Sequence, residues 1–256
     1  MTVVAEIRAD ELLKHTLEHV WSPQLRNSRN VDVSLPASYS MRRRYPVVYM
    51  QDGQNLSDPS IAFAGTWHLD AALERLAGRD VEPIIVGVHN TDNRLSEYSP
   101  FKHPRHGGGQ ADRYLAFLAD TLKPRIDRLF RTRRARAYTA IGGSSMGGLI
   151  SFYGWLRLPE TFGHAVAMSP SFWFGRDRLF EYVEAGKLPR GRLYLDVGTA
   201  EGEEALRDVR HMRALLHQKG IRPEAFSYYQ DRGGRHEEAA WAHRVEDALA
   251  FVTGER

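Results

Sequence analysis

The 256-residue sequence contains no cysteine. This absence excludes disulfide bonds, thiol nucleophiles and cysteine-ligated metals, although it leaves the redox compartment open. Long apolar runs are also missing, because no uninterrupted stretch approaches the roughly 20 residues that a membrane-spanning helix needs. The N-terminal stretch MTVVAEIRADELLKH mixes acids and bases and lacks the apolar core of a secretory signal. We therefore expect a cytoplasmic protein with no membrane partner.

A strong charge of either sign is missing too, because the formal net charge is only +3. This weakly basic balance favours anionic ligands slightly and does not indicate nucleic-acid binding. Arginines cluster at 41–45 and 128–138, but neither run interleaves aromatic side chains as a base-stacking platform would. We expect solvated loops and helix ends there, and no nucleic-acid partner.

Segments typical of strands alternate with segments that have helical periodicity. Strands are expected at 31–36, 45–51, 83–89, 137–141, 164–168, 192–198 and 225–230. Helices are expected at 66–77, with Thr66 as cap, and at 111–130, 203–220 and 236–252. Without repeats or a linker-like composition shift, this order predicts one domain over residues 1–256, a three-layer α/β/α sandwich with a mostly parallel sheet. Ligands of such folds bind beyond the carboxyl ends of the strands.

One such position is the serine- and glycine-rich stretch AIGGSSMGGLIS at 140–151. A phosphate-binding Walker loop would need lysine where Gly148 stands, and no glycine of the cluster begins a dinucleotide-binding G-x-G-x-x-G. The pattern G-x-S-x-G fits only when it is centred on Ser145, because Met146 occupies the glycine position for Ser144. A strand before it and a helix after it are the context of a nucleophile elbow. The sequence therefore predicts Ser145 as a nucleophile.

A serine nucleophile needs a base and an acid that orients the base, and in this fold they follow in the order serine, acid, histidine. His236 is the predicted base, because it follows the strand at 225–230 and precedes a helix. Glu201, a few residues past the strand at 192–198, is the predicted acid. Asp196, Asp231 and a pair without an essential acid remain as alternatives.

Backbone N–H groups must also stabilise the oxyanion that forms during acyl transfer. Met146, directly after the nucleophile, should supply one. Gln54, in the turn that ends the strand at 45–51, is the second candidate. The segment His106-Gly107-Gly108-Gly109 spells the HGGG of lipases, but it follows a loop rather than a strand. We interpret it as a lead-in to the helix at 111–130, beside the pocket.

Four segments in this order and spacing resemble one family: YPVVYMQDGQN, GGSSMGG, DVGTAEG and GGRHEEAAW. Over roughly residues 15 to 253 the chain is similar to the esterase D-like esterases of the α/β-hydrolase superfamily. That group includes enterochelin (siderophore), feruloyl and acetylxylan esterases, S-formylglutathione hydrolases and mycolyltransferases. The resemblance implies an α/β-hydrolase fold and the same roles for Ser145, His236, Glu201, Gln54 and Met146. The family's acid is often aspartate, so glutamate here changes the reach to the histidine.

The resemblance also suggests residues that border the substrate pocket. NRLSEYSP at 93–100 is similar to a loop of the siderophore-esterase branch, which would place Arg94, Glu97 and Tyr98 at the pocket; an Arg–Glu pair that holds the loop shut is the alternative. In SPSFWFG at 169–175, Trp173 would line the pocket, with buried aromatic packing as the alternative for it and its neighbours.

These features predict a serine carboxylic-ester hydrolase that acts through an acyl-enzyme on a small or medium ester of short-chain, aryl or siderophore type. We expect no cofactor and no metal, and a small-molecule ester as the partner. A homodimer is possible, and the sequence does not determine the oligomeric state. The alternatives are an acyltransferase or thioesterase with the same residues, and a non-catalytic α/β-hydrolase binding domain.

Overall fold

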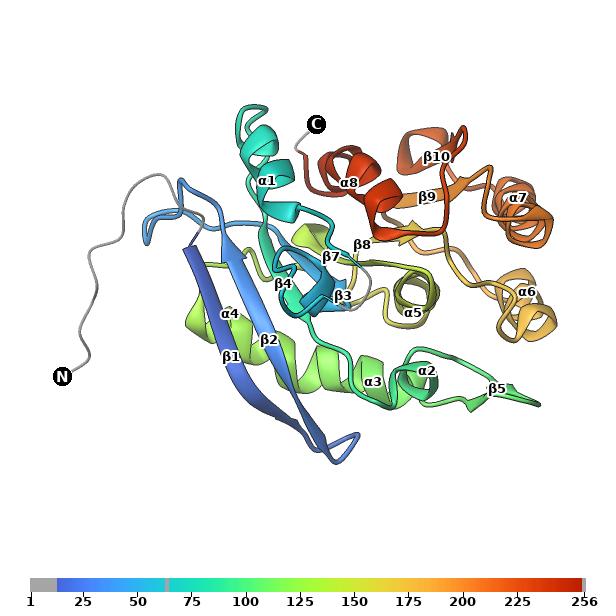
Figure 1. The fold of residues 1–256 in the computed structure, drawn as a ribbon, viewed down its shortest axis with the longest axis horizontal. Helices are drawn as coiled ribbons and strands as arrows, with labels where there is room; N and C mark the ends of the chain where they lie inside the picture. Colours follow the sequence, from blue (N-terminus) through green and yellow to red (C-terminus); the bar gives the residue numbers. More distant parts are fainter. Residues whose placement is uncertain (1–12, 63–64, 255–256) are drawn as a thin grey trace.

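The computed structural model describes residues 13–62 and 65–254, which form an eight-stranded sheet between two layers of helices (Figure 1). The strands are β1 (Leu13–Ser22), β2 (Asn27–Leu35), β3 (Val47–Gln51), β4 (Ile84–Val88), β7 (Thr139–Ser144), β8 (His164–Met168), β9 (Leu193–Gly198) and β10 (Phe226–Asp231). Their order in the sheet is β1-β2-β4-β3-β7-β8-β9-β10. β2 pairs antiparallel with β1 and β4, and the other neighbours pair in parallel. The predicted α/β fold with a mostly parallel sheet is confirmed.

Helices cover both faces of this sheet. They are α1 (Leu69–Ala77), α2 (Arg94–Glu97), α3 (Ala111–Ala116), α4 (Lys123–Leu129), α5 (Met146–Arg157), α6 (Arg176–Ala185), α7 (Glu203–Gln218) and α8 (Glu238–Thr253). Short turns of helix are η1 (Gly53–Asn55), η3 (Arg136–Tyr138) and η4 (Pro223–Ala225), and the π-helical η2 (Phe117–Leu122) joins α3 to α4. A separate two-stranded ribbon pairs β5 (Lys102–His103) with β6 (Gly107–Gly108).

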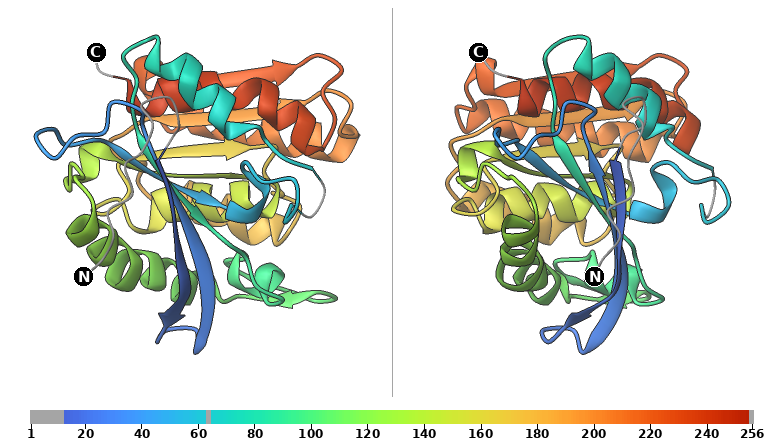
Figure 2. Two further views of the ribbon diagram at one scale, coloured as in Figure 1. Left: turned by 60° about the vertical axis from the view of Figure 1, so that its left-hand side comes forward. Right: turned by 90° about the vertical axis from the view of Figure 1, so that its left-hand side faces the viewer.

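The alternation of side chains along β3 explains the two layers. Val47 and Tyr49 pack into a core with residues of α3, α5, α6 and α7, whereas Val48 and Met50 pack with residues of α1 and α8. Because successive strand side chains point to opposite faces, a strand that is apolar throughout must be covered on both sides. Figure 2 shows α1 and α8 together on one face of the sheet and α5 on the other.

Some local predictions differ from the structure. Strand β1 and helix α6 were not expected. Helix α1 begins at Leu69 rather than near Thr66, because His68 takes a left-handed conformation (φ 48°) as its N-cap. The Thr66 hydroxyl instead accepts a hydrogen bond from the His68 N–H at 3.2 Å. The stretch examined for a secretory signal lies mostly outside the described residues, and the single-domain organisation stays a prediction.

Candidate active site

Ser145 occupies a strained turn between β7 and α5. Its backbone angles are φ 56° and ψ −123°, a conformation that non-glycine residues rarely adopt and that is concentrated at functional sites. The strand and the helix almost touch at this turn. A Cβ on Gly143 would lie 2.9 Å from the carbonyl carbon of Gly147, and a Cβ on Gly147 would lie 3.0 Å from Gln51 Cβ. Glycine is therefore required on both sides of Ser145, as the motif predicted.

The structure brings Ser145, His236 and Glu201 together from three separate loops. The Ser145 Oγ lies 2.9 Å from His236 Nε2, and His236 Nδ1 lies 2.8 Å from Glu201 Oε2. The His236 side chain is 41% exposed, whereas that of Glu201 is 1% exposed. The imidazole thus has one nitrogen on a buried carboxylate and the other on the serine hydroxyl, which a second hydroxyl, that of Ser171, approaches to 3.2 Å.

The second carboxylate oxygen of Glu201 also accepts hydrogen bonds. Oε1 accepts hydrogen bonds from Ser169 Oγ at 2.5 Å and from the Gly198 N–H at 2.6 Å. Burial is the largest influence on the Glu201 pKa and raises it, but the hydrogen bonds from His236, Ser169 and Gly198 together lower the pKa below its usual value. The carboxylate is therefore ionised at neutral pH and favours the Nδ1–H tautomer of His236.

Ser169 is the centre of a buried support for this acid. It follows β8 with a left-handed backbone (φ 41°). Its oxygen accepts hydrogen bonds from Trp241 Nε1 at 2.9 Å and from Arg244 Nη2 at 3.3 Å while its proton goes to Glu201. The Trp241 ring also meets the His236 ring edge-on, with centroids 5.0 Å apart. Helix α8 thus positions both the acid and the base.

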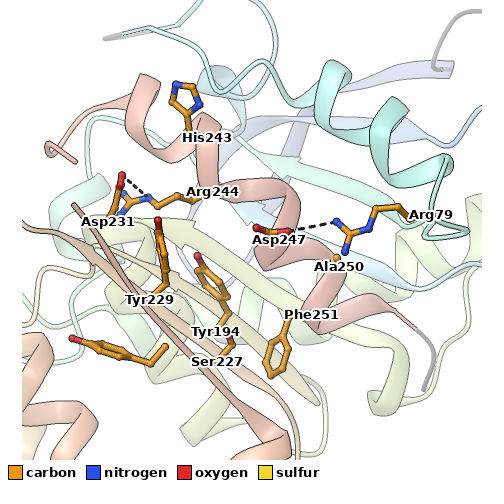
Figure 3. A pocket seen from close by; sticks show the side chains of 11 residues that line it. Arg79, Tyr194, Ser227, Tyr229, Asp231, His243, Arg244, Asp247, Ala250 and Phe251 are labelled. Atoms are coloured by element: carbon orange, nitrogen blue, oxygen red, sulfur yellow. Dashed lines mark hydrogen bonds and ion pairs between the residues drawn. The ribbon is translucent and has the colours of Figure 1, made fainter. Parts of the chain in front are cut away.

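The two alternative acids belong to the surroundings of Arg244. Asp196 is completely buried; its Oδ1 accepts the Ser169 N–H at 2.9 Å, and its Oδ2 lies 3.4 Å from Arg244 Nε. Burial raises the Asp196 pKa to about 7, against the attraction of Arg244. Asp231 Oδ2 lies 3.8 Å from the same nitrogen, where it borders a separate pocket of about 560 Å³ (Figure 3). Among the described residues His236 hydrogen-bonds Glu201 and neither aspartate.

On the other side of the serine, Gln54 lies in η1, directly after β3. The preceding Asp52 has a left-handed backbone (φ 56°), and its carboxylate accepts two hydrogen bonds from Arg94, at 2.7 and 2.8 Å, and one from Asn90 at 2.7 Å. The Asp52 N–H donates to the Tyr98 hydroxyl at 3.3 Å, and the Asn90 N–H donates to Gln54 Oε1 at 3.2 Å. This polar cluster fixes the turn that presents the Gln54 backbone to the site.

The residues expected to border the pocket lie in different places. Arg94 lines the cleft beside Ser145. Glu97 is buried behind the cleft in an ion pair of 2.8 Å with Arg29, and Tyr98 is completely buried. Glu97 therefore does not pair with Arg94. Trp173 is 40% exposed and is not among the described lining residues of the cleft.

The cleft beside Ser145 has a volume of about 880 Å³. Its described lining residues come from the end of β7, from the segments after β3, β4 and β7, from the loop between η1 and α1, and from the start of α8 with the loop before it: Asp52, Gln54, Asn55, Ser60, Ile61, Ala62, Asn90, Thr91, Asp92, Arg94, Ser144, Ser145, His236, Glu238 and Trp241. Glu238 and Asn90 were not predicted. The rule that ligands bind past the strand ends could have identified Asn90, which follows β4. The glycines at 107–109 lie outside this lining, in the β5–β6 ribbon that leads into α3.

The described residues show neither a metal-binding cluster nor a membrane-spanning helix. Within 13–62 and 65–254 no group of three or more histidine, cysteine, aspartate or glutamate side chains is arranged to hold a metal ion. No helix in this part of the chain is both long and apolar enough to cross a membrane.

Comparison with known proteins identifies the family. A family model described as "Putative esterase" matches residues 22–252, so the chain belongs to this esterase family and is a carboxylic-ester hydrolase. The assignment favours an enzyme over a non-catalytic binding domain.

The individual relatives share only about a quarter of their aligned residues with this chain or fewer. The uncharacterized protein YbbA of Bacillus subtilis is 26% identical over 89% of this chain and 93% of its own length. The iron(III) salmochelin esterase of Escherichia coli O6:H1 is 26% identical over 88% of this chain, which spans 53% of that protein. The crystal structure of the BES protein from Bacillus cereus has a TM-score of 0.78 at 20% identity and covers 100% of both chains. At that identity the structural likeness supports the fold alone.

Proposed function

We propose that this ester hydrolase works through an acyl-enzyme, with Ser145 as nucleophile, His236 as general base and Glu201 as the acid that orients it. The observation that carries the proposal is the pair of hydrogen bonds that runs from Ser145 Oγ through the imidazole to Glu201. A base within reach of a nucleophile, itself oriented by a third group, is the arrangement that activates serine.

In the first half of the reaction, Ser145 Oγ attacks the ester carbonyl carbon and its proton passes to His236 Nε2. The tetrahedral intermediate collapses when His236 returns this proton to the leaving alcohol, which leaves the acyl group on Ser145. Water then gives a proton to His236 and attacks the acyl carbon, and His236 finally reprotonates the Ser145 oxygen. Glu201 stabilises the imidazolium in both halves without taking its proton.

The backbone N–H groups of Gln54 and Met146 are the proposed donors to the oxyanion. Met146 begins α5, so its N–H is one of the amides without an intrahelical partner. Gln54 lies in the turn fixed by Asp52 and lines the same cleft as Ser145. Over the described residues neither amide donates to another backbone carbonyl. Both donors are therefore available to a substrate.

The proposed substrate is a small or medium ester of short-chain, aryl or siderophore type. The cleft volume of about 880 Å³ is within the usual range of small-molecule sites, and Trp241 and Ile61 give it apolar surface. The name of the salmochelin esterase supports the siderophore-type member of this range.

The test is hydrolysis of a panel of short-chain, aryl and catecholate esters by the wild-type protein, Ser145→Ala and Ser144→Ala. Loss of a complete catalytic triad can cost about 10⁶ in turnover, so Ser145→Ala should lose nearly all activity. Ser144→Ala, a change of the same size one residue away, should remain active. An active Ser145→Ala, or an inactive Ser144→Ala that is still folded, would overturn the assignment of the nucleophile.

A further inference from the structure

Carboxylates outnumber cations in the cleft, although the whole chain carries a net charge of +3. Three carboxylates are among its described lining residues, those of Asp52, Asp92 and Glu238. Arg94 supplies a single guanidinium to the same lining. The cleft therefore differs in sign from the surface of the molecule as a whole.

The positive charge of Arg94 is paired with the negative charge of Asp52. Its Nε and Nη2 hydrogen-bond the two oxygens of Asp52 at 2.7 and 2.8 Å, and its guanidinium lies 5.2 Å from the ring centroid of Tyr98. Such a two-point pair fixes the planes of both groups. The Asp52 carboxylate thus offsets the charge of Arg94, and a substrate anion would meet only the remaining N–H donors of this guanidinium.

Asp92 and Glu238 carry the remaining charge. Glu238 begins α8, two residues after His236, and its Oε1 accepts a hydrogen bond from Asn55 Nδ2 at 3.3 Å. Over the described part of the chain, no cation lies within 4.0 Å of either carboxylate. Burial raises the Glu238 pKa, and the negative charge of Asp52 acts in the same direction, as expected where carboxylates face one another.

We propose that Glu238, with Asp92, selects substrates by charge, so that the cleft accepts esters with a cationic group and disfavours esters with an anionic one. This inference rests on the proposed function of Ser145. The preferred substrate carries an ammonium or similar cation on its acyl part, within reach of Glu238. Within the siderophore-type esters of the proposed range, an intact iron(III) tris-catecholate chelate carries three negative charges and is therefore disfavoured, whereas an uncharged ester is accepted.

Elementary electrostatics gives the size of the effect. At an effective dielectric constant of about 40, between those of water and a protein surface, a unit charge about 6 Å from one carboxylate changes binding roughly tenfold. A cation should gain about this factor over an uncharged ester, and an anion should lose about the same. Because salt screens charges that face solvent, both factors should shrink in 1 M salt, and less for the buried Glu238 than for the exposed Asp92.

The experiment compares three esters of one leaving group, 4-methylumbelliferone, whose acyl chains end in a methyl, a trimethylammonium or a carboxylate group. For the wild-type protein we expect kcat/KM to fall in the order cationic, neutral, anionic, by roughly tenfold at each step. Glu238→Gln should reduce the cation-to-anion ratio by about 100-fold, because the gain of the cation and the loss of the anion disappear together, while the neutral ester stays within about threefold. Glu224→Gln, which removes the same charge from an exposed residue before β10, is the matched control and should leave the ratio unchanged.

Asp92→Asn provides a second variant, because Asp92 is exposed and its substitution should not affect folding. It should reduce the same ratio in the same direction. Equal rates for the three esters, a preference for the anion, or an unchanged ratio in both variants would overturn charge selection while Ser145 remains the nucleophile. If the wild-type protein hydrolyses none of the three, the proposed function itself fails. If Glu238 serves only the N-terminus of α8, Glu238→Gln lowers stability without changing the ratio, and the inference is wrong.

Discussion

The supports on the two sides of Ser145 are built in opposite ways. On the acid side, Glu201 is held by Ser169 and by Arg244, whose side chain is only 3% exposed. On the oxyanion side, the turn of Gln54 is held by the Asp52–Arg94 pair, whose side chains are 10% and 31% exposed. Buried charges are costly to leave unpaired, whereas exposed pairs contribute little to stability. Both sides should affect catalysis, and the more deeply buried acid side should contribute more to stability than the oxyanion side.

The largest expected effect comes from the acid itself. Glu201→Gln places an amide opposite His236 Nδ1 and favours the wrong tautomer, so we expect kcat to fall by about 10⁴. Glu201→Asp keeps the charge with a shorter reach and should lose much less. Steady-state kinetics on a neutral ester checks both variants, and a Glu201→Gln protein within tenfold of wild type would remove Glu201 from the mechanism.

The next effect should appear in stability. Arg244→Met leaves the buried carboxylates of Asp196 and Glu201 without their cation, so the free energy of unfolding should fall by about 3–5 kcal/mol. Arg79→Met, which removes a half-exposed arginine from its pairs with Glu246 and Asp247, is the control and should cost about 0–1 kcal/mol. Urea unfolding measures both. Equal losses would show that burial does not distinguish the two arginines.

On the oxyanion side, substitution of Arg94 should lower kcat and should cost less stability than substitution of Arg244. Arg94→Met frees Asp52 and loosens the turn of Gln54, so we expect kcat to fall by about 10–100-fold, less than the 10²–10³ for a lost donor. Stability should fall by about 1–3 kcal/mol, less than in Arg244→Met, because the buried Asp52 keeps the hydrogen bond from Asn90 and lies nearer to solvent than Asp196. Arg43→Met, at an exposed pair with Glu82, should change neither quantity. A large loss of stability with normal kcat in Arg94→Met would break the contrast between the two sides.

The smallest effect on kcat concerns the hydroxyl of Ser169. Ser169→Ala removes its hydrogen bond to Glu201 and its hydrogen bonds from Trp241 and Arg244, and kcat should fall by about 3–10-fold. The Glu201 pKa is lowered in the folded protein, so its contribution to stability is present above the unfolded value of 4.5 and is lost as the pH falls through the lowered pKa. Without Ser169 this pKa rises toward 4.5, so the pH window below 4.5 in which acid removes stability narrows, and Ser169→Ala should lose less stability on acidification than the wild-type protein. Urea unfolding between pH 3 and 6 checks this, with Ser227→Ala as control.

The sequence could indicate the side chains that the structure brings together at the cleft because each follows a strand end, where parallel sheets place their ligands. The motif around Ser145 and the loop positions of His236 and Glu201 are local signals of this kind. The buried strands β3 and β4 were equally clear, because their apolar runs require cover on both faces. Strand β1 was missed because charged and histidine residues interrupt its apolar pattern, as expected for an edge strand with an exposed face.

The residues that hold the site in place from behind could not be predicted from local sequence signals. Arg244 and Trp241 lie in the first half of an amphipathic helix, and only the packing of α8 across the sheet brings them to Ser169. The partner of Glu97 was also unpredictable, because Arg29 lies in a strand far away in the chain. Such pairs depend on tertiary geometry that no local spacing encodes.

The central claim is that Ser145 is the nucleophile activated by His236 and Glu201, and covalent labelling with a fluorophosphonate tests it most directly. Peptide mass spectrometry should place a single adduct on Ser145; the adduct should be absent from Ser145→Ala, retained in Ser144→Ala and formed far more slowly in Glu201→Gln. An adduct on Ser144, or labelling that survives in Ser145→Ala, would contradict the account.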